Sequence, residues 1–82
     1  MDIRKLKISG GHNNPWLASD TATGASKTEE TVTFEVPLPQ NPIVVITPTT
    51  NEDVWVTEVA TTHFKWDNNA GSSVDIHWIA IS

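Results

Sequence analysis

The segment with the clearest chemical potential is a tryptophan followed by three polar residues. Trp66 directly precedes Asp67, Asn68 and Asn69. An indole face can cover the apolar C–H face of a pyranose ring, while carboxylate and amide groups hydrogen-bond to the ring's hydroxyls. The segment therefore predicts a sugar-binding site. A tryptophan that closes the end of a β-barrel before an Asp-Asn turn would give the same pattern, and composition alone favours neither interpretation.

The histidines and carboxylates give no comparable pattern. His77 lies two residues after Asp75, so both share one face of a strand and could pair or bind a cation together. A hydrogen-bonded pair at a surface or interface is the more ordinary interpretation. Glu29 and Glu30 are adjacent and point to opposite faces of a strand, which excludes them as a local catalytic pair. Without a nucleophile elbow or a glycine-rich phosphate loop, we expect no enzyme, no metal site and no cofactor.

Charge and hydropathy exclude other partners. The 82 residues include ten acidic and five basic side chains, and three of the basic ones are Arg4, Lys5 and Lys7. The charged residues in the rest of the chain are mostly acidic and repel phosphate backbones, so nucleic acid is not an expected partner. No apolar run approaches the length of a membrane span, so we expect no membrane insertion. The first twenty residues lack the apolar stretch of a signal peptide, and we expect an extracellular or virion-associated location reached by another route.

Length and composition predict one domain over residues 1–82, with an all-β fold. Eleven threonines, many Val and Ile residues and prolines between apolar runs are typical of short strands. Period-two patterns predict strands at 2–8, 30–36, 43–46, 54–60, 64–66 and 73–81. Residues 9–28, anchored by Trp16, are expected to form a long irregular loop of functional importance. The run 43–46 is expected to be covered on both faces.

The last predicted strand suggests assembly. One of its faces carries Val74, Ile76, Trp78 and Ala80, and the other carries Asp75, His77, Ile79 and Ile81. A sandwich buries only one face of each sheet, so Ile79 and Ile81 need a second cover. The chain has no cysteine to stabilise it by disulfides. A neighbouring subunit is the favoured cover, and the N-terminal segment or residues 37–42 are the alternative.

The remaining tryptophans are less diagnostic. Trp78 alternates with Val74 and Ile76 and is expected in the core. Trp55 lies on the face opposite Val54 and Val56, where it could belong to a core or an interface.

Taken in order, several segments resemble a known family. They are Lys7-Ile8 with a glycine-rich stretch ending at Trp16, Val32-Thr33-Phe34, residues 42–47, Phe64 with Trp66, and the closing segment Ile76-His77-Trp78-Ile79-Ala80-Ile81. Together they look like the H-type lectin domain of snail agglutinins and the C-terminal lectin domain of discoidins. The similarity spans nearly the whole chain, and the closing strand is its most specific part.

The resemblance implies a six-stranded antiparallel β-sandwich that forms a homotrimer. It also implies binding of terminal galactose or N-acetylgalactosamine in a groove between protomers. The family's sugar-stacking tryptophan falls on Trp66, and its next three contact residues, a His, an Asn and a Tyr, fall on Asp67, Asn68 and Ser72. The family's sugar-contacting Arg aligns with Asp53. A Gly and an Asp from the neighbouring protomer fall near Gly24 and Ser26.

Departures from the family change the expected ligand. The Arg and His that donate to sugar hydroxyls are replaced by Asp53 and Asp67, which only accept while ionised. The Tyr and the neighbour's Asp are also replaced, the segment between Phe64 and Trp66 is shorter, and the snail lectins' cysteines are missing. Carboxylates on an acidic protomer favour neutral or amine-bearing sugars over acidic glycans, and a cation could also bridge them to hydroxyls.

Two functions from different classes remain. The leading one is a carbohydrate-binding module, a multivalent trimeric lectin that recognises cell-surface or polysaccharide glycans, with neutral galactose-like or N-acetylgalactosamine-like sugars expected. The alternative is a structural trimerisation or tip domain of a fibrous protein, such as a virion tail, in which the groove binds no sugar.

Overall fold

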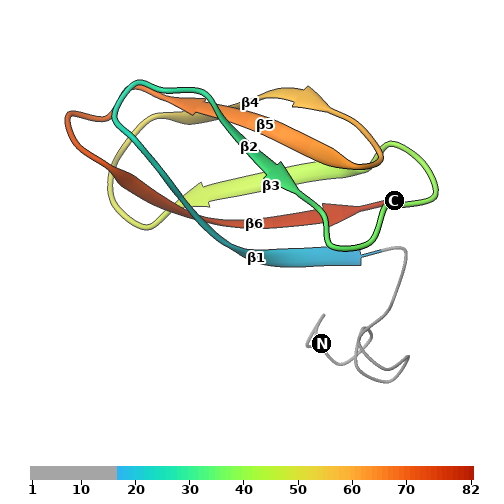
Figure 1. Cartoon of the computed structure of the whole chain (residues 1–82). Helices are drawn as coiled ribbons and strands as arrows, with labels where there is room; N and C mark the ends of the chain where they lie inside the picture. Colours follow the sequence, from blue (N-terminus) through green and yellow to red (C-terminus); the bar gives the residue numbers. More distant parts are fainter. Residues whose placement is uncertain (1–16) are drawn as a thin grey trace.

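A computed structural model describes residues 17–82, which form six β-strands (Figure 1). The strands are β1 (Leu17–Gly24), β2 (Glu30–Thr33), β3 (Ile43–Pro48), β4 (Val54–Val59), β5 (His63–Asn68) and β6 (Val74–Ile81). The prediction of an all-β, antiparallel fold is confirmed over this range, where five of the six strands were predicted and β1 was not. The strand expected at 2–8 and the anchor Trp16 lie outside the described residues. No helix in residues 17–82 is long and apolar enough to cross a membrane.

The strands form two antiparallel sheets of three strands each. In the first, called sheet A, the order is β1-β6-β3, and in the second, sheet B, it is β2-β5-β4. The two C-terminal strands, β5 and β6, are therefore central, and each neighbouring pair is antiparallel. Figure 1 shows the sheets stacked face to face, with β4 and β5 in one layer and β1 and β6 in the other. Each sheet therefore has an inner face toward the other sheet and an outer face.

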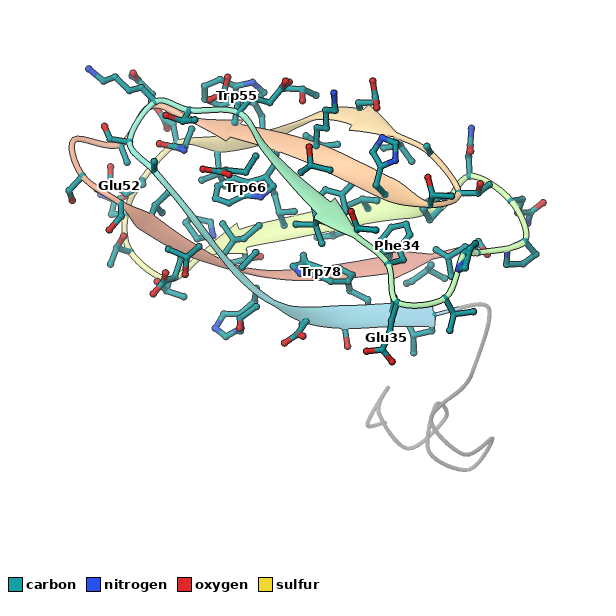
Figure 2. The ribbon with its side chains drawn as sticks, in the orientation of Figure 1. Phe34, Glu35, Glu52, Trp55, Trp66 and Trp78 are labelled. Carbon is teal, nitrogen blue, oxygen red and sulfur yellow. The ribbon has the colours of Figure 1, made fainter. Side chains whose placement is uncertain are left out.

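The core fills the space between the sheets. It consists of Phe34, Leu38, Phe64, Trp66, Ala70, Val74, Ile76, Trp78 and Ala80. Three of its aromatic rings pack together, with the Trp78 centroid 5.2 Å from Phe64 and 5.8 Å from Phe34 (Figure 2). Burying such large apolar side chains is the main stabilising term in a small domain. The predicted alternation of β6 is confirmed, because all four of its expected core residues are buried.

The expectation that residues 9–28 are an irregular loop is wrong for their second half. Leu17–Gly24 is β1, which pairs with β6 along its whole length, from Leu17 opposite Ile81 to Gly24 opposite Val74. Its small residues Ala18 and Ala22 pack against the core, and the polar Asp20 lies at the register position between them, opposite Trp78. Alanine has a low strand propensity, and this inward face therefore gives a weak sequence signal.

Two further expectations about strands need correction. β2 ends at Thr33, and the chain then turns, with the Phe34 amide donating to the Thr62 carbonyl at 2.9 Å. Residue Val36 is consequently 49% exposed instead of continuing a buried face. Ile43 and Val45 of β3 are 73% and 52% exposed, so this run is not covered on both faces. The reason is that a two-layer sandwich offers a strand only one neighbouring layer.

A β-bulge interrupts β4 opposite the middle of β5. Val56 pairs with Trp66, whereas the next paired residue on β4 is Glu58, opposite Lys65. The extra residue, Thr57, shifts the alternation by one position. As a result Thr57 and Glu58 are both exposed, and Val59 returns to the half-buried face. The outer face of sheet B thus gains one additional polar side chain.

Candidate functional site

Most of the predicted sugar-site residues gather at one end of the sandwich. Gly24 is the last residue of β1, Asn68 is the last of β5, and Asp53 directly precedes β4. Ser26 follows β1, and its Oγ donates a 2.5 Å hydrogen bond to the carbonyl of Ala70. The backbone N–H of Asn69 donates to the Asp53 carbonyl at 3.1 Å. These contacts form within one chain, whereas the resemblance implies that Gly24 and Ser26 come from a neighbouring protomer.

Trp66 belongs to the core. Its side chain has 0% exposure, and Figure 2 shows it between the two sheets. A Cβ atom added to Gly24 would lie 2.6 Å from Cη2 of Trp66, which is closer than a real contact allows. Gly24 therefore makes room for this indole. A sugar-stacking role for Trp66 is incompatible with its burial, because a ring without an exposed face cannot cover a ligand.

Asn68 is also a structural residue. It is 2% exposed, and its Oδ1 accepts hydrogen bonds from the backbone N–H groups of Lys27 at 2.9 Å and Ala70 at 3.1 Å. Its Nδ2 donates to the carbonyls of Ala25 at 3.0 Å and Thr28 at 3.4 Å. These four bonds saturate the amide and hold the β1–β2 connection against the end of β5. The side chain has no capacity left for a sugar hydroxyl.

The last three predicted residues, Asp53, Asp67 and Ser72, keep some surface in contact with solvent. Asp53 and Ser72 are exposed, one before β4 and the other in the turn before β6. Asp67 is half-buried and points to the outer face of sheet B, because neighbouring residues of a strand face opposite sides. Its Oδ1 accepts a 2.7 Å hydrogen bond from the backbone N–H of Asn68, which fixes the carboxylate. Asp67 thus faces the side of β5 opposite to Trp66 and Asn68.

The outer face of sheet B contains an aromatic residue that the site prediction missed. Trp55 is 43% exposed and pairs with Asp67 across β4 and β5. The next outward residue of β5 is Lys65, which pairs with Thr31 on one side and Glu58 on the other. Strand alternation predicts that Trp55 and Asp67 both point away from Val56 and Trp66. Only the pairing register of β4 with β5 places them side by side.

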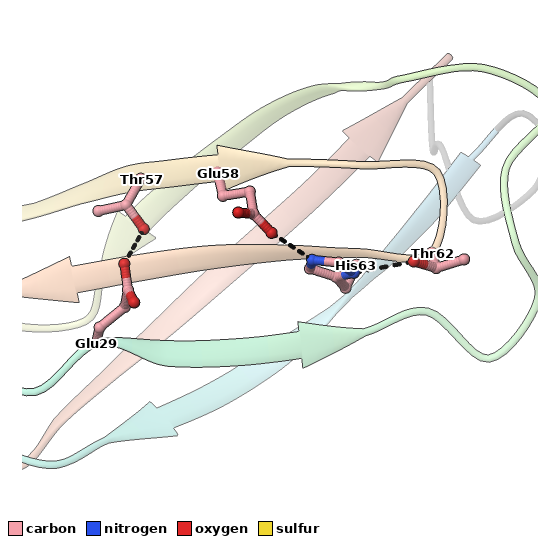
Figure 3. Close-up of polar contacts among 5 residues, drawn as sticks. All are labelled: Glu29, Thr57, Glu58, Thr62 and His63. Atoms are coloured by element: carbon pink, nitrogen blue, oxygen red, sulfur yellow. Dashed lines mark hydrogen bonds and ion pairs between the residues drawn. The ribbon is translucent and has the colours of Figure 1, made fainter.

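Polar contacts cross the rest of this outer face (Figure 3). The Thr57 hydroxyl donates to Oε2 of Glu29 at 2.6 Å, and Nε2 of His63 lies 2.6 Å from Oε2 of Glu58. The His63 hydrogen bond, together with the positive charge of Lys65, lowers the pKa of Glu58 from its ordinary value of 4.5. The face therefore combines one indole with fixed acceptors and one ammonium group.

The outer face of sheet A is apolar over half its length. Ile43 of β3 pairs with Ile81 of β6, and Val45 pairs with Ile79. We call these four residues the apolar face. Ile43, Val45 and Ile81 are all more than 40% exposed, and Ile79 is half-buried. The prediction that Ile79 and Ile81 lie on the side opposite the core is confirmed, and their cover by a subunit stays a prediction.

Polar residues occupy the other half of that outer face. Asp75 accepts a 2.6 Å hydrogen bond from the hydroxyl of Thr23, its partner on β1. Within residues 17–82, no three His, Asp or Glu side chains are grouped so that they could hold a metal ion. The face is thus polar toward the β5–β6 turn and apolar toward the C-terminal end of β6.

No protein-family model matches the chain, and no curated protein matches it. The architecture of two three-stranded antiparallel sheets agrees with the fold that the resemblance to H-type lectins implies. Because one β-sandwich architecture hosts many unrelated functions, this agreement does not establish membership of the family.

Proposed function

We propose that this chain is a carbohydrate-binding module that acts as a homotrimer, a multivalent lectin for neutral galactose-like or N-acetylgalactosamine-like glycans. The glycans would be those of a cell surface or a polysaccharide. The observation that carries the assembly part of the proposal is the apolar face of sheet A. The sugar part is supported by the resemblance of the ordered sequence segments to H-type lectins.

The apolar face needs a cover for energetic reasons. Its four residues are aliphatic and lie on two adjacent strands, in rows about 4.8 Å apart. Removing apolar surface from water contributes roughly 25 cal/mol per Å². A small domain without cysteines gains much from such burial, because its own core is limited. In the proposed trimer, the three copies would turn this same face toward a common three-fold axis.

The charge of the protein favours neutral glycans. The formal net charge is −5, and Asp53 and Asp67 replace the family's cationic contacts. Carboxylates accept hydrogen bonds from sugar hydroxyls, but they repel sialylated, sulfated or uronate glycans. Three weak sites in one trimer gain avidity when the glycans are presented on one surface.

A second candidate is a structural trimerisation domain without sugar binding. One observation favours it. Trp66 and Asn68 are buried, and their side chains contact other residues of the same chain, so neither can line the sugar-binding groove that the resemblance implies. In this function the sandwich would supply symmetry and rigidity to a fibrous protein, such as a virion tail. Both candidates require the same assembly.

Two measurements on the purified chain test these proposals. Light scattering should give a mass of three times the 9.0 kDa protomer. A folded monomer at micromolar concentration would contradict both candidates. A glycan array should show binding to neutral glycans and none to acidic ones. A stable trimer with a silent array would reject the lectin and support the structural domain.

A further inference from the structure

Trp55 is an unusual surface residue in this molecule. Among the Phe and Trp side chains of residues 17–82 it is the one that is exposed, and the others are buried in the core. Figure 2 shows its indole on the outside of sheet B, away from Trp66 and Trp78. A single exposed apolar side chain is ordinary on a protein surface, so what points to a ligand is the set of polar groups that lie beside this indole.

The neighbours of Trp55 are polar and fixed in position. Asp67 lies directly opposite on β5, and its carboxylate is oriented by the N–H of Asn68 at 2.7 Å. The bulge exposes Thr57, whose hydroxyl binds Glu29 at 2.6 Å. Lys65 is the next outward residue on β5. This part of sheet B thus presents the flat apolar face of the indole beside carboxylates, which accept hydrogen bonds, and the ammonium group of Lys65, which donates them.

We propose that Trp55 and Asp67 form a binding site for one neutral pyranose unit on the outer face of sheet B. This inference rests on the proposed lectin function and gives it a location different from the end groove that the resemblance implies. The indole covers the C–H face of the ring, and Asp67 accepts a hydrogen bond from a ring hydroxyl. The ammonium group of Lys65 donates to a second hydroxyl.

The size and charge of this face favour a sugar over other ligands. One exposed indole matches the footprint of one ring, whereas a stable protein interface buries about 800 Å² on each partner. Glu29, Glu58 and Asp67 outnumber Lys65, so anionic ligands such as nucleic acid or uronates are repelled. The apolar face belongs to the other sheet, and assembly through it leaves Trp55 free.

The site can be tested with small monovalent probes, for which avidity plays no part. The probes are the methyl pyranosides of galactose, N-acetylgalactosamine, glucose and mannose, with methyl glucuronide as the acidic comparison. Saturation-transfer NMR on the full chain reports binding of each probe. A proton–nitrogen spectrum follows the indole N–H signal of Trp55, which is assigned by its absence in a Trp55→Phe variant.

We expect at least one neutral pyranoside to bind and to shift the Trp55 signal. Trp55→Ala should weaken that binding about tenfold. Asp67→Asn should also weaken it, because the amide keeps the bond from Asn68 N–H but is a poorer acceptor than a carboxylate. The matched control is Val36→Ala, which removes an equally exposed apolar side chain in another region and should change nothing. Circular dichroism checks that each variant is folded.

Three results would overturn the inference. Binding that is unaffected by Trp55→Ala places the sugar elsewhere and leaves the lectin function standing. A fall in mass on light scattering of Trp55→Ala identifies Trp55 as part of a subunit interface. The third result is that no neutral probe binds and the glycan array is also silent. This would reject both the Trp55 site and the lectin function. A trimer in light scattering would still support the proposed assembly.

Discussion

The two outer faces of the sandwich have opposite chemical character, although both come from sheets of three antiparallel strands. On sheet A, the apolar face of Ile43, Val45, Ile79 and Ile81 has no polar side chain within it. On sheet B, one indole is surrounded by carboxylates, hydroxyls and an ammonium group. The inner faces of both sheets supply the shared core, so the difference in the outer faces is not required by folding. The difference is consistent with the two proposals above, in which sheet A meets further copies of the chain and sheet B binds a sugar.

The largest expected effect is on assembly, and it is found by placing an aspartate on one outer face or on the other. Val45→Asp should convert the proposed trimer into monomers, because covering an unpaired carboxylate costs several kcal/mol. The isolated chain should still fold, since Val45 is 52% exposed. Thr31→Asp, on the outer face of sheet B, is the control and should leave the mass unchanged. Light scattering with circular dichroism measures both. If both variants gave the same mass, the two outer faces would not differ in their role in assembly.

A second prediction concerns the core between the faces. Gly24→Ala should lower the free energy of unfolding by about 1–3 kcal/mol, because the new methyl group would overlap the Trp66 ring. Gly71→Ala is the matched control, since a Cβ there has no heavy atom within 4 Å. Urea denaturation measures both. If Gly24→Ala is as stable as the wild type, the Trp66 ring has space to move, and its exclusion from ligand binding no longer holds.

The sequence predicts the sheets better than it predicts the site. In β6, large apolar residues alternate with polar ones over half the strand, so its core face follows from periodicity. In β1 the inward positions are held by Ala18 and Ala22, whose small side chains give little signal. Phe64, Trp66 and Asn68 alternate along β5, and this spacing is the cue that all three share the inner face.

The candidate site depends on information that one strand does not contain. Trp55 meets Asp67 only through the register of β4 with β5, and the bulge at Thr57 changes which later residues face outward. A bulge has no reliable sequence signal here, although the spacing of Val54, Val56 and Val59 departs from strict alternation. Cross-strand pairing is a property of the folded sheet, so the sequence alone could not place these residues together.

A third prediction separates the two carboxylates, Asp53 and Asp67, that the resemblance places in the sugar site. Asp67→Asn should improve binding of methyl glucuronide several-fold by removing a negative charge beside Trp55. Asp53→Asn should have a smaller effect, because Asp53 precedes β4 and lacks the direct cross-strand pairing with Trp55 that Asp67 has. The gain should shrink in high salt, which screens exposed charges. NMR titration with the glucuronide compares the variants. A larger gain for Asp53→Asn would indicate that the sugar binds at the end of the sandwich, where the resemblance places the site, and not beside Trp55.

The smallest expected effect is the pH dependence of the polar face. The pKa of Glu58 is lowered by its hydrogen bond to His63 and by the charge of Lys65. A carboxyl whose pKa is lower in the folded state than in the unfolded chain releases its proton more readily when folded. At pH values between these two pKa values, the unfolded chain therefore binds more protons. Its stabilising contribution is therefore complete above the ordinary value of 4.5 and is lost as the pH falls through the lowered folded pKa. Because the pair is exposed, water and salt screen it, and the contribution is small.

Glu58→Gln should consequently make the unfolding free energy less dependent on pH below 5, while changing it little at neutral pH. Thr47→Ala, on the outer face of sheet A, serves as the control and should keep the slope of the wild type. Thermal unfolding between pH 3 and pH 7 gives both slopes. An unchanged slope in Glu58→Gln would mean that the Glu58–His63 contact does not persist in solution. The outer face of sheet B would then be less ordered than its hydrogen bonds indicate, which would weaken the contrast with the apolar face.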